Sequence, residues 1–111
     1  MSKKTIVYLA GPLRGNIIRK WANIYVAKKY ARMLWHLGYI VYSPHLNSGW
    51  LDHPLTDKMV MTANIVLLGK CDCLVLMDGW EQSVGTLAEI RAANEMAMPV
   101  YHIADLVRHN G

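Results

Sequence analysis

Ser83, Gly85 and Glu89 are the residues whose types and spacing could do chemistry in this sequence of 111 residues. They follow an apolar run over residues 73–77 and enter a helical pattern that continues to about residue 96. In open α/β sheets, ligands bind at the carboxyl ends of the strands, where helix N-termini point. A carboxylate placed there can attack or stabilise the anomeric carbon of a bound sugar, as glycosidases do. We therefore predict covalent chemistry at Glu89, because the positive end of the helix dipole favours its ionised form.

The same residues have plainer interpretations, which the sequence leaves open. Glu89 could be an exposed helix glutamate that pairs with a neighbouring cation. Ser83 could cap the helix N-terminus, and this role is compatible with anion binding, because a capped N-terminus with Gly85 behind it can also hold a phosphate. Two further residues complete this candidate site: Asp78, at the ligand end of the strand, and Trp80, whose ring could stack on a base or pack on the core.

A second candidate segment follows residues 5–10, which are β-branched, aromatic or apolar throughout, as in a strand covered on both faces. After this strand, Gly11 and Gly15 would let the backbone approach a ligand closely. Arg14 could bind a phosphate through two parallel hydrogen bonds or simply lie on the surface. Tyr8 lies near the carboxyl end of the strand, where most tyrosines belong to the core and have a satisfied hydroxyl.

Hydrophobic periodicity predicts the elements that must position these residues. Helices are expected over residues 18–37, 57–69 and 84–96, and further strands over residues 39–42, 73–77 and 100–103. This alternation predicts an α/β, flavodoxin- or Rossmann-like three-layer domain with a parallel sheet of four or five strands in the order 2-1-3-4. The loops that follow strands one and three then face each other across one crevice.

Two expectations concern individual side chains. The second helix is expected to turn Ala63, together with Val66 or its neighbour, toward the core, because these residues recur at helical spacing. Cys71 and Cys73 are expected to share one face of the third strand, since side chains alternate along a strand. Their spacing is no disulfide framework, so both thiols are expected to be reduced and mostly buried.

Length and charge bound the possible functions. The length predicts one domain over residues 1–111. The net charge is +4, and the first 51 residues contain no Asp or Glu. Such a basic half favours an anionic partner: a phosphorylated small molecule, an acidic protein or, ranked last because it rests on charge alone, nucleic acid. Lys28, Lys29 and Arg32 could instead form a solvated helix face.

Several classes of site are not indicated. The sequence has no metal-ligand spacing, Walker A sequence, dinucleotide fingerprint or nucleophile elbow, so we expect neither a metal nor a cofactor. It has no signal peptide and no apolar run long enough to cross a bilayer, which predicts a cytoplasmic protein without a membrane partner. His45 opens a loop over residues 45–56 that is long enough to be functional, although a lone loop histidine is more often a bystander.

With these residues laid out, the chain resembles the nucleoside 2-deoxyribosyltransferase-like superfamily. The resemblance rests on Tyr8-x-x-Gly11-x-x-Arg14-Gly15 at the first strand end, on Cys71-Asp72, and on Ser83-x-Gly85-x-x-x-Glu89. It is closest to a family of small, often phage-encoded proteins (DUF4406-like) that share the Gly-Trp-Glu-x-Ser-x-Gly pattern of residues 79–85. The similarity covers roughly residues 6–100.

The resemblance implies a flavodoxin-like fold and cleavage of the N-glycosidic bond of deoxynucleosides or their 5′-monophosphates. Glu89 matches the nucleophile that forms a glycosyl-enzyme intermediate, and Tyr8 matches the tyrosine that positions it. At the position of Ser83, transferases tend to have an Asp that contacts the 5′-hydroxyl, whereas monophosphate hydrolases have a Ser that contacts phosphate. Ser83 and Arg14 therefore resemble the monophosphate branch.

Two points separate this chain from the superfamily pattern. Asn64 stands where the superfamily usually has an Asp that helps protonate the leaving base, and an amide cannot deliver a proton. The superfamily also implies a homo-oligomer whose site is completed near the C-terminus of a neighbouring subunit, where this chain offers His102, Arg108, His109 and Asn110. We expect hydrolysis or exchange at the N-glycosidic bond of a (deoxy)nucleoside 5′-monophosphate; the alternative is a catalytically weak or inactive nucleotide-binding protein.

Overall fold

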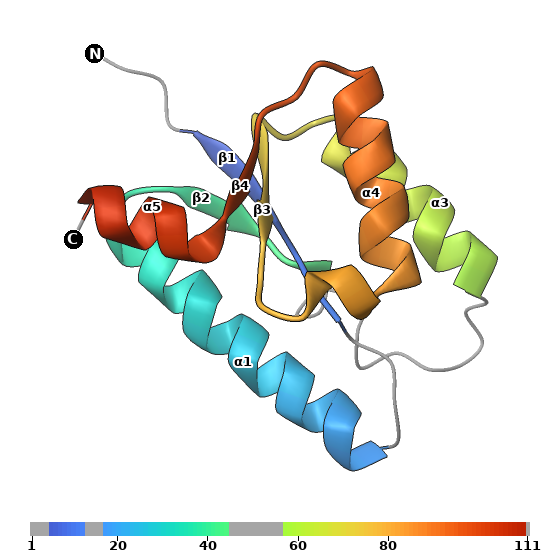
Figure 1. Ribbon diagram of the computed structural model, residues 1–111, viewed down its shortest axis with the longest axis horizontal. Coiled ribbons are helices and arrows are strands. Elements are labelled where there is room, and N and C mark those ends of the chain that lie inside the picture. Colours follow the sequence, from blue (N-terminus) through green and yellow to red (C-terminus); the bar gives the residue numbers. More distant parts are fainter. Residues whose placement is uncertain (1–4, 13–16, 45–56, 111) are drawn as a thin grey trace.

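The computed structural model describes residues 5–12, 17–44 and 57–110 and contains four parallel strands in the order β2-β1-β3-β4 (Figure 1). The strands are β1 (Ile6–Ala10), β2 (Ile40–Tyr42), β3 (Cys73–Leu76) and β4 (Val100–His102). The helices are α1 (Ile17–His36), α3 (Asp57–Leu68), α4 (Val84–Glu95) and α5 (Ile103–Asn110), with a short 3-10 helix, η1 (Trp80–Gln82), after β3. The predicted fold class and strand order are confirmed, and the residues after β4 form α5 and no fifth strand.

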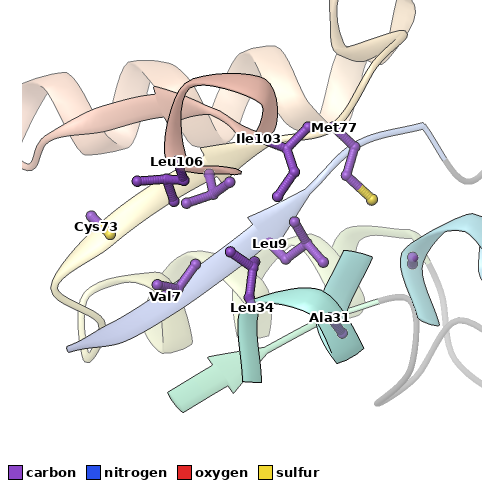
Figure 2. Packing of buried hydrophobic residues seen from close by; sticks show 10 residues of the cluster. Val7, Leu9, Ala31, Leu34, Cys73, Met77, Ile103 and Leu106 are labelled. Carbon is purple, nitrogen blue, oxygen red and sulfur yellow. The ribbon is translucent and has the colours of Figure 1, made fainter. Parts of the chain in front are cut away.

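Helices cover the sheet on both faces, which gives the three predicted layers (Figure 1). Strand alternation in β1 divides its side chains between two cores. Val7 and Leu9 belong to the cluster that includes residues of α1 and α5, such as Leu34 and Leu106 (Figure 2). Tyr8 belongs instead to the cluster that contains Leu68 of α3 and Ala93 of α4, and is directed to that side of the sheet.

The central position of β1 explains its near-continuous apolar sequence. It pairs with β2 through Ile6–Ile40 to Tyr8–Tyr42 and with β3 through Val7–Cys73 to Ala10–Leu76. A strand with neighbours on both edges and helices on both faces has no side open to water, so both sets of alternating side chains are buried.

The packing face of α3 differs from the prediction. Ala63 is exposed and Val66 is 59% exposed, whereas Asn64 and Leu68 are buried. The prediction counted apolar residues, and it failed because a polar residue, Asn64, occupies an inward position. Only Leu68 follows it at the i+4 spacing expected of a packed helix face.

The two cysteines also differ from the prediction in one respect. Both are free thiols, as expected; Cys73 is buried and Cys71 is partly buried. They lie on opposite faces of the sheet, because Cys73 packs on the α1 side and Cys71 on the α3–α4 side. The alternation rule does not apply to Cys71, since β3 begins only at Cys73. Within the described ranges, none of the helices has the length and hydrophobicity that a membrane span requires.

Candidate active site

A buried tyrosine and a buried glutamate meet between the sheet and α4. The hydroxyl of Tyr8, from β1, donates a hydrogen bond to Oε2 of Glu89, from the second turn of α4. Tyr8 is fully buried and Glu89 is 5% exposed. The alternative of an exposed surface glutamate is therefore wrong. The alternation that directs Tyr8 toward α3 and α4 is what brings its hydroxyl to Glu89, 81 positions later in the chain.

The protonation of this pair follows from its burial. Burial raises the pKa of the Glu89 carboxyl to about 7, although the hydrogen bond from Tyr8 acts in the opposite direction. Burial and then the negative charge of Glu89 raise the pKa of the Tyr8 hydroxyl well above its usual range, so Tyr8 remains a donor. The sequence predicted that the helix dipole would favour ionised Glu89. Burial outweighs that effect, because the dipole's field falls off within the first turn.

Ser83 caps α4, as one of its two interpretations predicted. Its Oγ accepts a hydrogen bond from the backbone N–H of Thr86 at 3.1 Å, and its own backbone is extended. Gly85 lies directly behind it, where a Cβ atom would come within 2.9 Å of the Met61 Cε atom of α3. The missing side chain at Gly85 therefore lets the N-terminal end of α4 pack closely against α3.

The loops after β1 and β3 contact each other, as the predicted strand order requires. Gly79 has a left-handed backbone, with φ of 86°, and a Cβ atom there would lie 3.2 Å from the Pro12 side chain. A Cβ atom at Gly11 would lie 2.8 Å from the Cε atom of Met77. Glycine at both positions therefore permits the close approach of these two segments at the carboxyl edge of the sheet.

Asp78 lies in a second polar group, at the ends of β3 and β4. Its Oδ1 lies 2.9 Å from Nε2 of His102, and the Tyr30 hydroxyl of α1 contacts its Oδ2 at 3.4 Å. The other ring nitrogen of His102, Nδ1, accepts a hydrogen bond from the backbone N–H of Ala104. With Nδ1 occupied as the acceptor of this hydrogen bond, Nε2 is the ring nitrogen that faces Asp78. This group connects the loop after β3 to the start of α5.

Comparison with known proteins places the chain in a family. The sequence model of the protein family DUF4406, described as a domain of unknown function, matches residues 5–102. The chain belongs to the DUF4406 family. No curated protein matches it. Among solved structures, it is similar to a 2-deoxyribosyltransferase from the psychrotolerant bacterium Bacillus psychrosaccharolyticus, with 20% sequence identity, a TM-score of 0.62, and coverage of 87% of this chain and 70% of the other. This similarity shows the deoxyribosyltransferase-like, flavodoxin-like fold.

Some predicted site residues of this DUF4406 protein lie outside the described residues, namely Arg14, Gly15 and His45. Trp80 is partly buried and packs against the core cluster on the α3–α4 side, which is the plainer of its two predicted interpretations. Asn64 is 8% exposed on α3, and within the described ranges no hydrogen bond to its side chain is found. A buried amide without a protein partner is uncommon, since its donors and acceptor lose their bonds to water.

Two residues of this DUF4406 protein were not expected at the site. Thr86 is 1% exposed, and its backbone N–H donates a hydrogen bond to Oγ of the capping residue Ser83. His102 was considered only for a neighbouring subunit, yet it pairs with Asp78 of its own chain. The position of His102 at the end of β4, beside the end of β3, was the signal that could have indicated this contact. Among the described residues, no group of three or more His, Cys, Asp or Glu side chains could hold a metal ion.

Proposed function

We propose that this protein cleaves or exchanges the N-glycosidic bond of a (deoxy)nucleoside 5′-monophosphate, with Glu89 as the nucleophile. The observation that carries the proposal is the buried hydrogen bond from Tyr8 to Glu89, below the capped N-terminus of α4. Burying a charged carboxylate does not stabilise the fold, because desolvation opposes its ionisation. Its presence is better explained by chemistry at the ligand end of the sheet.

In the proposed reaction, an oxygen of the Glu89 carboxylate forms a bond to C1′ of the sugar while the bond from C1′ to the base nitrogen breaks. The base leaves with the electron pair of that bond and takes a proton from the solvent. Water then attacks C1′, loses a proton to the solvent and releases the Glu89 carboxylate, which gives hydrolysis. Attack by a nitrogen of a second base, which likewise loses a proton, gives transfer. Tyr8 would hold the carboxylate in place throughout, because its raised pKa keeps the hydroxyl protonated.

The 5′-phosphate is the part of the proposed substrate that Ser83 and Arg14 would recognise. Ser83 caps α4, and the N-terminus of a helix attracts anions through its free backbone N–H groups and its dipole. Arg14 follows β1, whose end lies beside the end of β3 in the sheet. The absence of acidic residues from the first 51 positions is in keeping with an anionic substrate.

The test is base release from a panel of nucleoside and deoxynucleoside 5′-monophosphates, followed by chromatography. We expect Glu89→Ala to lower the rate by about 10³-fold or more while nucleotide binding, measured by calorimetry, is largely kept. Glu95→Ala is the matched control, because Glu95 is an exposed glutamate of the same helix. Wild-type rates in the Glu89→Ala variant would refute the role of Glu89.

A second candidate function is nucleotide binding without turnover, and the observation that favours it is Asn64. An amide can hydrogen-bond a base but cannot protonate it as it leaves. If proton delivery limits the reaction, Asn64→Asp should accelerate base release. Thermal stabilisation by a nucleotide without any base release, in both the wild type and this variant, would favour the binding protein.

A further inference from the structure

Asn64 is a buried amide without a hydrogen-bond partner among the described residues. Its side chain is 8% exposed, and no hydrogen bond to it is found within residues 5–12, 17–44 and 57–110. The next inward residue of α3, Leu68, is apolar and fully buried. An amide buried in this way opposes folding, since its donors and acceptor lose their bonds to water. Its presence on the inward side of α3 indicates that it serves a ligand.

Helices α3 and α4 pack in register on one face of the sheet. Because all four strands are parallel, both helices run back in the same direction, and they lie side by side (Figure 1). Near their N-terminal ends, Gly85 lies against Met61. About two turns further along each helix, Leu68 and Ala93 belong to the same buried cluster. The two helices therefore stay level with each other between these contacts.

This register places the Asn64 amide level with the Glu89 carboxyl. Asn64 stands about one turn after Met61, and Glu89 stands about one turn after Gly85. Both side chains are buried, and Glu89 accepts its hydrogen bond from Tyr8 of the central strand. An uncharged amide therefore borders the buried region that holds the carboxyl group of the proposed reaction.

The chemistry of the departing base decides which bases an amide can serve. A purine leaves readily only when one of its ring nitrogens is protonated, and an amide cannot deliver that proton. A 2,4-dioxopyrimidine, such as uracil or thymine, can leave as an anion, because the charge at N1 is delocalised onto its carbonyl oxygens. An N–H group placed at such an oxygen stabilises the charge that develops as the bond breaks.

We propose that the base bound beside Glu89 is a 2,4-dioxopyrimidine, which the Asn64 side chain recognises. The amide N–H donates to a carbonyl oxygen of the base, and the amide oxygen accepts from the neighbouring imide N–H. When the bond from C1′ to N1 breaks, N1 keeps the electron pair and the negative charge spreads to that oxygen. The base takes a proton from the solvent only after it has left. This inference rests on the proposed function and specifies the base for that site.

Rates of base release are compared among the 5′-monophosphates of deoxyuridine, thymidine, deoxyadenosine and deoxyguanosine. We expect the wild type to release uracil and thymine about 10²-fold faster than either purine. Asn64→Asp keeps the shape of the side chain and should reverse this preference, because a carboxylate repels the anionic base and a carboxylic acid can protonate a purine. Asn94→Asp is the matched control, since Asn94 is an exposed asparagine of α4, and it should keep the wild-type preference.

Calorimetric binding of the same nucleotides to Glu89→Ala gives a readout that needs no turnover. This variant should bind the two pyrimidine nucleotides about 10-fold more tightly than the purine nucleotides. Adding Asn64→Ala should remove the preference, and this change also serves if Asn64→Asp does not fold.

The outcomes separate the identity of the base from the proposed reaction. Faster release of purines by the wild type, or an unchanged preference in Asn64→Asp, would overturn the dioxopyrimidine and leave the role of Glu89 intact. If no nucleotide loses its base, the proposed function fails and binding decides on the base. A binding preference that Asn64→Ala removes then supports the dioxopyrimidine, whereas equal binding of all four nucleotides refutes it.

Discussion

At the scale of single residues, burial raises the pKa of the Glu89 carboxyl and the hydrogen bond from Tyr8 lowers it. Burial has the larger effect. The folded-state pKa of about 7 lies above the ordinary value of 4.5, so the folded protein holds this proton more tightly than the unfolded chain does. Between these two values the free energy of unfolding contributed by Glu89 falls as pH rises. Above pH 7 the cost of burying the charge is fully present.

We therefore predict that the stabilisation gained from Glu89→Gln grows between pH 4.5 and pH 7 and stays constant at higher pH. The amide removes the charge and can still accept the hydrogen bond from Tyr8. The gain should be close to zero at pH 4.5 and roughly 3 kcal/mol above pH 7, since one pKa unit corresponds to about 1.4 kcal/mol. Denaturant unfolding at several pH values measures it. A difference that does not change with pH would mean that Glu89 is not buried as a charge.

A second prediction at this scale concerns Tyr8→Phe. The Tyr8 hydrogen bond lowers the pKa of Glu89, so its loss should move that pKa further above 7. If ionised Glu89 is the nucleophile, base release rises with pH through its pKa, and the variant's pH–rate profile should shift to higher pH. Tyr101→Phe, on the exposed side of β4, should leave the profile unchanged. An unshifted Tyr8→Phe profile would contradict a positioning role for Tyr8.

At the scale of elements, the C-terminal ends of α1 and α4 form the same left-handed turn with different residues. After α1, Gly38 has φ of 99°, and the N–H of Tyr39 donates a hydrogen bond to the carbonyl of Leu34 at 3.1 Å, which caps the helix. After α4, Ala97 has φ of 56°, with an equivalent bond from Met98 to Ala93 at 2.8 Å. A side chain in this left-handed region is strained, whereas glycine is not.

Reciprocal substitutions should therefore change stability in opposite directions. Ala97→Gly should raise the free energy of unfolding, and Gly38→Ala should lower it, each by about 1 kcal/mol. A Cβ atom at Gly38 would have nothing within 4 Å, so its effect would be conformational and not steric. Thermal or chemical unfolding of both variants measures whether each change in the free energy of unfolding is positive or negative. Destabilisation by Ala97→Gly would show that the alanine methyl contributes packing that outweighs the strain.

Some helices and strands could be predicted from the sequence, and others differ from the prediction. The four strands and their order were predictable, because near-continuous apolar runs such as that of β1 occur where both faces are covered. The inward face of α3 was not, because Asn64 is polar and periodicity counts only apolar residues. The sequence indicated Tyr8 and Glu89 as candidates, but their contact and the burial of Glu89 depend on packing across 81 positions.

At the scale of the whole molecule, charge and apolar surface are segregated. All eight acidic residues follow position 51, and the exposed side of α1 is basic. Helix α3, on the opposite face of the sheet, has no charged residue between Met59 and Leu68 (Figure 1). The two outer layers of the fold therefore differ in the charge that they present to solvent.

The position of Tyr8 in the middle of the central strand determines how the proposed activity would be lost on heating. Its backbone is hydrogen-bonded within a strand that has a neighbour on each edge, so Tyr8 can leave its place only when the sheet itself opens. The Tyr8 amide should accordingly be among the slowest to exchange with deuterium. On heating, the Tyr8–Glu89 pair should persist until global unfolding, so that inactivation and loss of fold occur at one temperature.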